Sequence, residues 1–126
     1  MGLKGVHIGL TVTDPAASAD WYENVFGAQR MMEDENAVFF MIPDDLILGL
    51  LRHEGTRSDD RFSHERVGLD HFAVHCGDRA ELEKWEGRLN ELGIANSGIV
   101  DDAYGHHLNF RDPDNIALEL FAVPAG

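Results

Sequence analysis

One short pattern occurs twice in this chain of 126 residues, and it limits the folds that the chain can adopt. His7 and Asp14 stand seven residues apart near the start, and His71 and Asp78 repeat that spacing 64 residues later. The same offset relates the chain's two tryptophans. A repeat of this length indicates one structural unit that is used twice.

The end of each unit also repeats, at an offset of 70 residues. Residues 43–50, PDDLILGL, align with residues 113–120, PDNIALEL. The histidine near the start of the unit is kept in both copies, whereas Glu119 in the second copy faces Gly49 in the first. Duplication can arise from stability alone, so a functional interpretation depends on the polar residues that the repeat places inside strands.

Size and charge narrow the possible classes of protein. The mass of 14.0 kDa suits a single domain over residues 1–126, since a chain of this size buries roughly two-thirds of its unfolded surface. The net charge of −13 would repel phosphate backbones and anionic membranes, so neither nucleic acid nor a membrane is expected as a partner. No apolar run reaches the ~18 residues that span a bilayer. The single Cys76 cannot form an internal disulfide, which suits the reducing cytoplasm.

The first unit, residues 5–52, has the pattern of a strand, a helix and three further strands. Residues 5–12 are rich in β-branched side chains and are bounded by a glycine and a turn. Asp14 then supplies a helix N-cap, and Gly27 supplies a left-handed stop. Three further strands are predicted at 28–33, 36–42 and 46–52, with the last two joined at Pro43-Asp44-Asp45.

The second unit, residues 67–123, repeats this order after a connector. Residues 53–66 carry charge and little periodicity, so they are predicted to be exposed, with His53 and His64 solvated. The second unit then has a strand at 67–76, a helix from Asp78 to Gly93, and strands at 94–100, 106–111 and 115–122. The predicted class is therefore α+β, with two βαβββ modules in tandem.

Three residues of types that commonly bind metals are predicted on corresponding sides of their strands. Alternation along a strand separates His7, His71 and Glu119 from the apolar side that each helix should cover, so all three should face the space that the two units enclose. Taken alone, a strand histidine is more often a hydrogen-bonded rim residue, and Glu119 would be an edge-strand acid. The repeat favours ligands, and Glu119 among apolar neighbours, with nothing basic paired to its strand, needs a cation.

Two imidazoles and one carboxylate form the ligand set typical of Fe(II), and they also suit Mn(II), Ni(II), Co(II) or Zn(II). Such a set leaves coordination positions open for a substrate. Near Glu119, the candidates for proton transfer are His107 and Asn109 on the preceding strand and Tyr104 in the loop before it. An imidazole or a phenol there could move a proton to or from an oxygen of the substrate.

The opening HIGLTVTDPAASADWYENVFGA, the strand LDHFAV and the closing FRDPDNIALEL together resemble the vicinal oxygen chelate superfamily. This superfamily includes glyoxalase I, fosfomycin- and bleomycin-resistance proteins, and extradiol dioxygenases. The resemblance covers essentially the whole chain. It implies a half-open barrel of mixed sheets with the helices outside, and a divalent metal bound by His7, His71 and Glu119. It also implies a homodimer, with the cleft formed within or across chains.

Two departures from the family pattern bear on the activity. Glyoxalase I-type members take a fourth ligand from the fourth strand, where this chain has Gly49. Ring-cleaving and fosfomycin-modifying members usually have a tyrosine ten residues before the glutamate, where this chain has Asn109. The favoured hypothesis is an enzyme of the extradiol dioxygenase type that uses Fe(II) and chelates a small substrate through vicinal oxygens. The alternatives are a glyoxalase I-like lyase or isomerase, and a non-catalytic protein that sequesters a small molecule such as an antibiotic.

Overall fold

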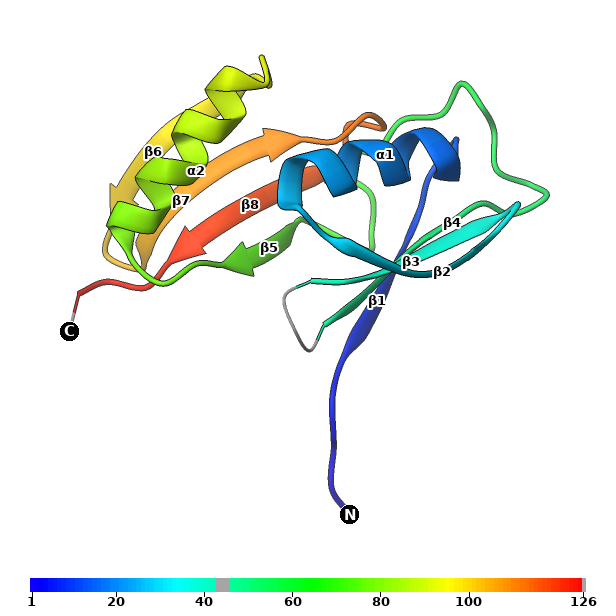
Figure 1. Cartoon of the computed structure of the whole chain (residues 1–126), viewed down its shortest axis with the longest axis horizontal. Helices are drawn as coiled ribbons and strands as arrows, with labels where there is room; N and C mark the ends of the chain where they lie inside the picture. The colour runs from blue at the N-terminus through cyan, green and yellow to red at the C-terminus, as the bar shows by residue number, and fades with distance from the viewer. Residues whose placement is uncertain (43–45, 126) are drawn as a thin grey trace. The chain divides into compact units, whose positions relative to one another are not determined.

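The computed structural model describes residues 1–42 and 46–125, and it divides the chain into two compact units, Met1–Asp60 and Arg61–Gly126. Each unit contains one four-stranded sheet and one helix (Figure 1). The division falls inside the segment 53–66 that the sequence predicts as a connector. The turn predicted at 43–45 lies outside the described residues.

The first unit follows the predicted order of a strand, a helix and three strands. Its elements are β1 (His7–Thr11), α1 (Pro15–Phe26), β2 (Gln29–Asp34), β3 (Ala37–Met41) and β4 (Ile47–Leu51). The strands lie in the order β1-β4-β3-β2, with β1 parallel to β4 and the other pairs antiparallel. Helix α1 packs on β3 and β4.

The second unit repeats the arrangement. Its elements are β5 (Phe72–His75), α2 (Arg79–Glu91), β6 (Asn96–Asp102), β7 (Gly105–Arg111) and β8 (Ala117–Ala122). The strands lie in the order β5-β8-β7-β6, with β5 parallel to β8 and the other pairs antiparallel. The α+β class and the two tandem βαβββ modules are confirmed. Neither helix in the part of the chain that the structure describes has the length and apolarity to cross a bilayer.

Strand β5 is shorter than the sequence predicts. The prediction began the strand at residue 67, but the ladder with β8 begins where Phe72 pairs with Leu118. Strand β8 itself starts at Ala117, after a tight turn, so the residues before Phe72 have little strand beside them to pair with. His71 therefore lies just before β5 rather than inside it.

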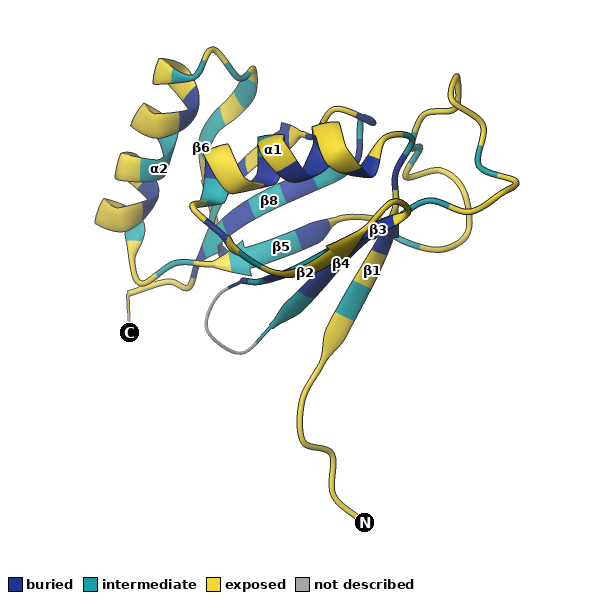
Figure 2. Ribbon diagram, turned by 45° about the vertical axis from the view of Figure 1, so that its right-hand side comes forward, coloured by how far each residue is buried: buried dark blue, intermediate teal, exposed yellow. Residues whose placement is uncertain are grey.

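Each sheet has one face under its helix, and this face forms the core. In β8, Leu118, Leu120 and Ala122 are buried, whereas the alternate residues Glu119 and Phe121 are only half-buried on the other face. Helix α2 packs on the buried face of β8, and Figure 2 shows the division of each helix into a buried and an exposed side. The side predicted for Glu119 is confirmed, so the polar face of the second sheet is open to carry a site.

The caps of both helices agree with the prediction. Asp14 Oδ1 accepts a hydrogen bond from the Ala17 N–H at 3.2 Å, and Asp78 Oδ1 accepts one from the Glu81 N–H at 2.8 Å. Such caps each stabilise a helix by about 1 kcal/mol because they satisfy backbone donors that have no partner within the helix. The two aspartates of the sequence repeat therefore start the two helices.

Gly87 lies in the middle of α2, where we expect Gly87→Ala to stabilise the protein. A Cβ atom built at Gly87 would meet no other atom within 4 Å, so the glycine has no packing role. Alanine is favoured over glycine in a helix interior by about 1 kcal/mol. Urea unfolding should show a gain of that order. An unchanged or reduced free energy of unfolding would contradict it.

An ion pair network joins the start of α2 to β6 and β7, and it should make stability depend on pH. Arg79 donates to both carboxylate oxygens of Asp101 at 3.0 and 3.1 Å, and His106 Nδ1 lies 2.6 Å from Asp101 Oδ1. Arg79, followed by His106, lowers the pKa of Asp101 to about 2.

Because this pKa is lower in the folded protein, the stabilisation is complete above about pH 4, the ordinary range for an aspartate, and disappears as the pH falls towards 2. We expect Asp101→Asn to lower the Tm at pH 7 and to approach the wild-type Tm in acid. Thermal melts between pH 7 and pH 2 test this, with Glu54→Gln on the exposed connector as the control. A Tm difference that stays constant across this range would refute the expectation.

Candidate metal centre

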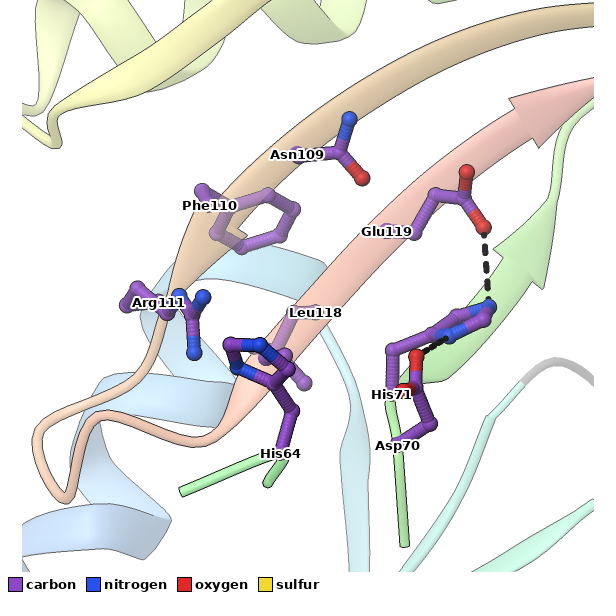
Figure 3. Close-up of a pocket in the computed structure, with 9 residues that line it drawn as sticks. His64, Asp70, His71, Asn109, Phe110, Arg111, Leu118 and Glu119 are labelled. Atoms are coloured by element: carbon purple, nitrogen blue, oxygen red, sulfur yellow. Dashed lines mark hydrogen bonds and ion pairs between the residues drawn. The ribbon is translucent and has the colours of Figure 1, made fainter. Parts of the chain in front are cut away.

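The neighbouring strands β5 and β8 bring two predicted ligands together. The parallel register pairs Ala73 with Glu119, so His71, two residues before Ala73, projects beside the carboxylate. His71 Nε2 lies 3.4 Å from Glu119 Oε2 (Figure 3). Two donor atoms that each lie 2.0–2.2 Å from one metal ion are separated by roughly 3 to 3.5 Å. The spacing and chemistry of this pair therefore fit two ligands of a divalent cation.

The ring of His71 is oriented by the residue before it. Asp70 Oδ1 lies 2.7 Å from His71 Nδ1, and this hydrogen bond lowers the pKa of Asp70. With Nδ1 engaged by Asp70, Nε2 is the nitrogen that a metal could use, and it is the one that faces Glu119. Asp70 is a site residue that the sequence interpretation missed. The Asp-His dipeptide was the available signal, because metal-binding histidines commonly donate their second nitrogen to a carboxylate.

The second oxygen of Glu119 is held by His107 on the neighbouring strand β7. His107 Nδ1 lies 2.5 Å from Glu119 Oε1, and its Nε2 lies 3.0 Å from Asp102 Oδ2. Hydrogen bonds to Glu119 and then to Asp102 raise the pKa of His107, although partial burial opposes them. His107 in turn lowers the pKa of Asp102. The His107 ring thus lies between two carboxylates, with one carboxylate at each nitrogen.

The contact between His107 and Glu119 shows that one prediction from the sequence was wrong. Glu119 was expected to pair with nothing basic, and a metal was invoked to balance its charge. Its side chain is only 11% exposed, so the carboxylate does need compensation. The contact with the His107 ring supplies part of it from a diagonal position, because the register places Asn109, not His107, directly opposite Glu119.

The third predicted ligand, His7, lies at the start of β1 in the first unit, and its side chain is exposed. Within residues 1–42 and 46–125, no group of three or more His, Cys, Asp or Glu side chains is clustered as a complete metal site. The second unit thus contributes two of the three predicted ligands, and the role of His7 stays a prediction.

A pocket of about 260 Å³ opens beside the His71–Glu119 pair. Its lining residues come from β7, β8 and the segment before β5, and they are His64, Asp70, His71, Asn109, Phe110, Arg111, Ala117, Leu118 and Glu119. His64 is exposed, as predicted for the connector, and it also lines the pocket, which the sequence did not predict. Its separation of seven residues from His71 gave no periodic signal.

The three predicted proton-transfer residues lie in different surroundings. Asn109 lines the pocket. His107 does not line it but contacts Glu119, which does. Tyr104 lies in the turn between β6 and β7, is 82% exposed and does not line the pocket. A role in proton transfer stays a prediction for all three residues, and the geometry favours His107 and Asn109.

Gly49 stands where glyoxalase I-type members have a fourth ligand, and the space beside it is occupied by a neighbouring side chain of the first unit. Gly49 pairs with Phe39 across β3 and β4. A Cβ atom at Gly49 would lie 2.8 Å from Cε1 of the Phe39 ring, closer than real Cβ contacts allow. Any ligand side chain at this position would therefore have to displace the ring.

Fold and site together define a member of the vicinal oxygen chelate class. The sequence matches the Glyoxalase/Bleomycin resistance protein/Dioxygenase superfamily over residues 4–120, and the chain belongs to this family. A domain of the same superfamily from Frankia sp. EAN1pec is 31% identical with a TM-score of 0.86, and the match covers 98% of this chain and 100% of that one.

Other relatives carry different activities. The catechol-2,3-dioxygenase of Bacillus subtilis (strain 168) is 31% identical over 122 residues, which cover 94% of this chain and 42% of that protein. The chain therefore spans less than half of this relative's length. The lactoylglutathione lyase of Agrobacterium tumefaciens is 23% identical with a TM-score of 0.75, covering 93% of this chain and 91% of that one.

The fosfomycin resistance protein FosX of Listeria monocytogenes, in complex with Mn(II) and sulfate, is 22% identical with a TM-score of 0.76. That match covers 98% of this chain and 93% of the FosX chain. At this level of identity, the lyase and FosX support the fold alone, because one fold can carry several chemistries.

Proposed function

We propose that this protein is a divalent-metal-dependent enzyme that binds a small substrate through two adjacent oxygen atoms, with extradiol-type ring cleavage as its favoured reaction. One observation carries the proposal. His71 Nε2 and Glu119 Oε2 face each other at 3.4 Å, while the second polar atom of each side chain is held by Asp70 or His107. Such outer partners orient ligands and are typical of metal sites. His7 is the proposed third ligand, because the repeat equates it with His71.

The choice of reaction has two supports. Three protein ligands leave positions open for both oxygens of the substrate and for dioxygen, and Fe(II) is the metal that favours this chemistry. The similarity to a catechol-2,3-dioxygenase agrees with it. The lyase alternative, with Mn, Ni, Co or Zn, is weakened by Gly49 and by the Phe39 ring packed over it. Ring cleavage is weakened by Asn109, where ring-cleaving members usually have a tyrosine, and the three-ligand set is what favours it.

The residues of the chain have separable roles in this proposal. A bound divalent ion would supply Lewis acidity, which lowers the pKa of two adjacent substrate hydroxyls. His107 Nδ1 contacts Glu119 Oε1, so that Oε2 of the carboxylate is the oxygen turned to His71. Asn109 lines the pocket and can donate a hydrogen bond from its amide to a substrate oxygen. In the favoured reaction both atoms of dioxygen enter the ring-opened product.

The test combines metal analysis with an activity panel. Protein purified without oxygen should contain about one divalent ion per chain, which should be lost in His71→Ala and in His7→Ala. His53→Ala, in an exposed connector position, is the matched control and should keep its metal. Oxygen uptake with catechol would support ring cleavage, and turnover of a 2-oxoaldehyde would support the lyase instead.

One outcome would favour the alternative of a sequestering protein. If the wild type bound small aromatic ligands equally well with and without metal, and His71→Ala did not change this, the enzyme proposal would fail.

We also propose that the protein is a cytoplasmic homodimer. The dimer follows from the family resemblance, and the lack of a disulfide at Cys76 suits a reducing compartment. Light scattering should then report about twice 14.0 kDa.

A further inference from the structure

The pocket beside β8 has two chemically different ends. His71 and Glu119, the proposed metal ligands, form one end (Figure 3). Arg111 and His64 line the other end, where they bring one permanent positive charge and one titratable group. Metal ligation does not require this second end, so its chemistry bears on what else the pocket binds.

Arg111 differs from the arginines of this acidic chain that pair with carboxylates. Arg30 pairs with three carboxylates, and Arg79 pairs with two. In the described part of the chain, no carboxylate lies within ion-pairing distance of Arg111, and its Nη1 donates only to the backbone oxygen of Asn115, at 3.1 Å. Arg52 likewise donates to backbone oxygens, those of Thr13 and Thr56, but it does not line the pocket. With 23 acidic residues against 10 basic ones, a cation without a carboxylate partner at a pocket is available to an anionic ligand.

The turn between β7 and β8 holds Arg111 in this position. Asp112 is buried, and its Oδ1 accepts hydrogen bonds from the N–H groups of Asp114 and Ile116, both at 2.8 Å. Asn115 takes a left-handed conformation with φ at 69°, and its carbonyl oxygen accepts the bond from Arg111. A rigid turn therefore orients one edge of the guanidinium and leaves the other donors of the group for a ligand.

The same turn also positions the segment that carries His64. The Phe62 N–H donates to the Asp114 oxygen at 2.9 Å, and Asn115 Nδ2 donates to the Phe62 oxygen at 3.2 Å. These two bonds fix the backbone two residues before His64. One structural element thus places both basic side chains at the pocket.

We infer that the Arg111 end of the pocket binds a carboxylate of the substrate. The substrate class is then an aromatic or small aliphatic acid that carries two adjacent oxygens at its other end. This inference rests on the proposed function and names its substrate class. The planar guanidinium matches a carboxylate through two parallel hydrogen bonds, and one arginine with one imidazole suits a single negative charge. With the two adjacent oxygens chelated at the metal-binding end, the carboxylate would reach Arg111 at the other end, and this pairing sets the orientation of the substrate.

The floor of the pocket suits such a molecule. Ala117 pairs with Arg111 across β7 and β8, and it lies two residues before Glu119 on the same face of β8. Two residues along a strand cover roughly 7 Å, which is about the span of a benzene ring with its substituents. The small side chain of Ala117 leaves this space open.

The test compares two ligands that differ only by a carboxylate, catechol and 3,4-dihydroxybenzoate. Their affinities for the metal-loaded protein are measured by anaerobic calorimetry. We expect the wild type to bind the carboxylated ligand roughly 10- to 100-fold more tightly, the range for hydrogen bonds to charged groups. Arg111→Gln should remove this preference while leaving the affinity for catechol unchanged. Arg57→Gln, which makes the same charge change on the connector, should keep the preference.

Arg111→Lys retains a cation without the planar fork, so it should keep only part of the preference, and a melting curve checks that each variant folds. Equal binding of the two ligands by the wild type, or an unchanged preference in Arg111→Gln, would overturn the carboxylate assignment and leave the proposed function standing. Catechol binding that is no tighter with metal than without it would instead overturn the proposed function, and the carboxylate assignment with it.

Discussion

Glu119→Gln is expected to weaken metal binding by at least roughly 100-fold while the protein stays folded, since loss of an outer hydrogen-bond partner alone costs 10- to 100-fold. In the wild type, one carboxylate oxygen faces His71 and the other faces His107. An amide has only one oxygen, so its NH2 group must face one of these two rings. If the oxygen stays with His107, the NH2 group occupies the position of the metal-binding oxygen.

Metal content and affinity are the measurements for this variant, with competition against a chelator at fixed pH. Glu83→Gln is the matched control, because Glu83 pairs with Arg79 on the exposed side of α2 and makes the same change of charge. Glu119→Asp keeps the charge on a shorter side chain and should fall between the two. Wild-type metal affinity in Glu119→Gln would show that the carboxylate is not a ligand.

The sequence repeat and strand parity were sufficient to predict most of the fold. Leu118 and Leu120 are buried under α2 and Glu119 faces the other side, as the alternation indicated. The error at the start of β5 has a simple cause. The run VGLDHFAVHC has strand-forming side chains throughout, but a strand needs a neighbour, and β8 reaches back only to Ala117. Local propensity cannot report where the partner strand begins.

Helix α1 shows a similar limit. The buried stripe predicted from the sequence consists of Ala17, Trp21, Val25 and the neighbouring Tyr22 and Phe26. Tyr22 and Val25 are fully buried, but Ala17 is exposed and Trp21 only half-buried. The apolar residues cover a wide part of the helix surface, so the helix could rotate about its axis and still bury apolar side chains. The packing partner on β3 and β4 then decides which residues are buried.

That His71 and Glu119 lie together was predictable from the sequence, whereas the residues that contact them were not. His71 and Glu119 carry a signal because the repeat and alternation mark them. The contact between His107 and Glu119 depends on the register of β7 against β8, which pairs Asn109 with Glu119 and brings His107 in diagonally. His64 reaches the pocket only through the hydrogen bonds that tie Phe62 to the β7–β8 turn. Strand register and tertiary hydrogen bonds leave no periodic pattern in the sequence, so neither contact could be predicted from it.

Gly105→Ala is expected to destabilise the protein by roughly 2–5 kcal/mol, a large part of the 5–15 kcal/mol that is typical of folded domains. Gly105 starts β7 with φ at 150°, a conformation that side chains other than glycine rarely adopt. A Cβ atom there would lie 2.6 Å from both the Ala122 oxygen and the Phe121 ring. The backbone oxygen cannot move without disturbing the pairing of β7 with β8, so relaxation is costly.

Urea unfolding of Gly105→Ala should therefore show a much lower midpoint, whereas Gly77→Ala is the control because its added Cβ would meet nothing closer than 3.9 Å. The effect should also reach the metal centre. The Phe121 ring lies 5.0 Å from the His107 ring between centroids, so displacing Phe121 disturbs the group that orients Glu119. In the fraction that stays folded, metal affinity should fall as well. A Gly105→Ala variant with wild-type stability would mean that the strand can shift at this point, and the placement of His107 would then not depend on the glycine.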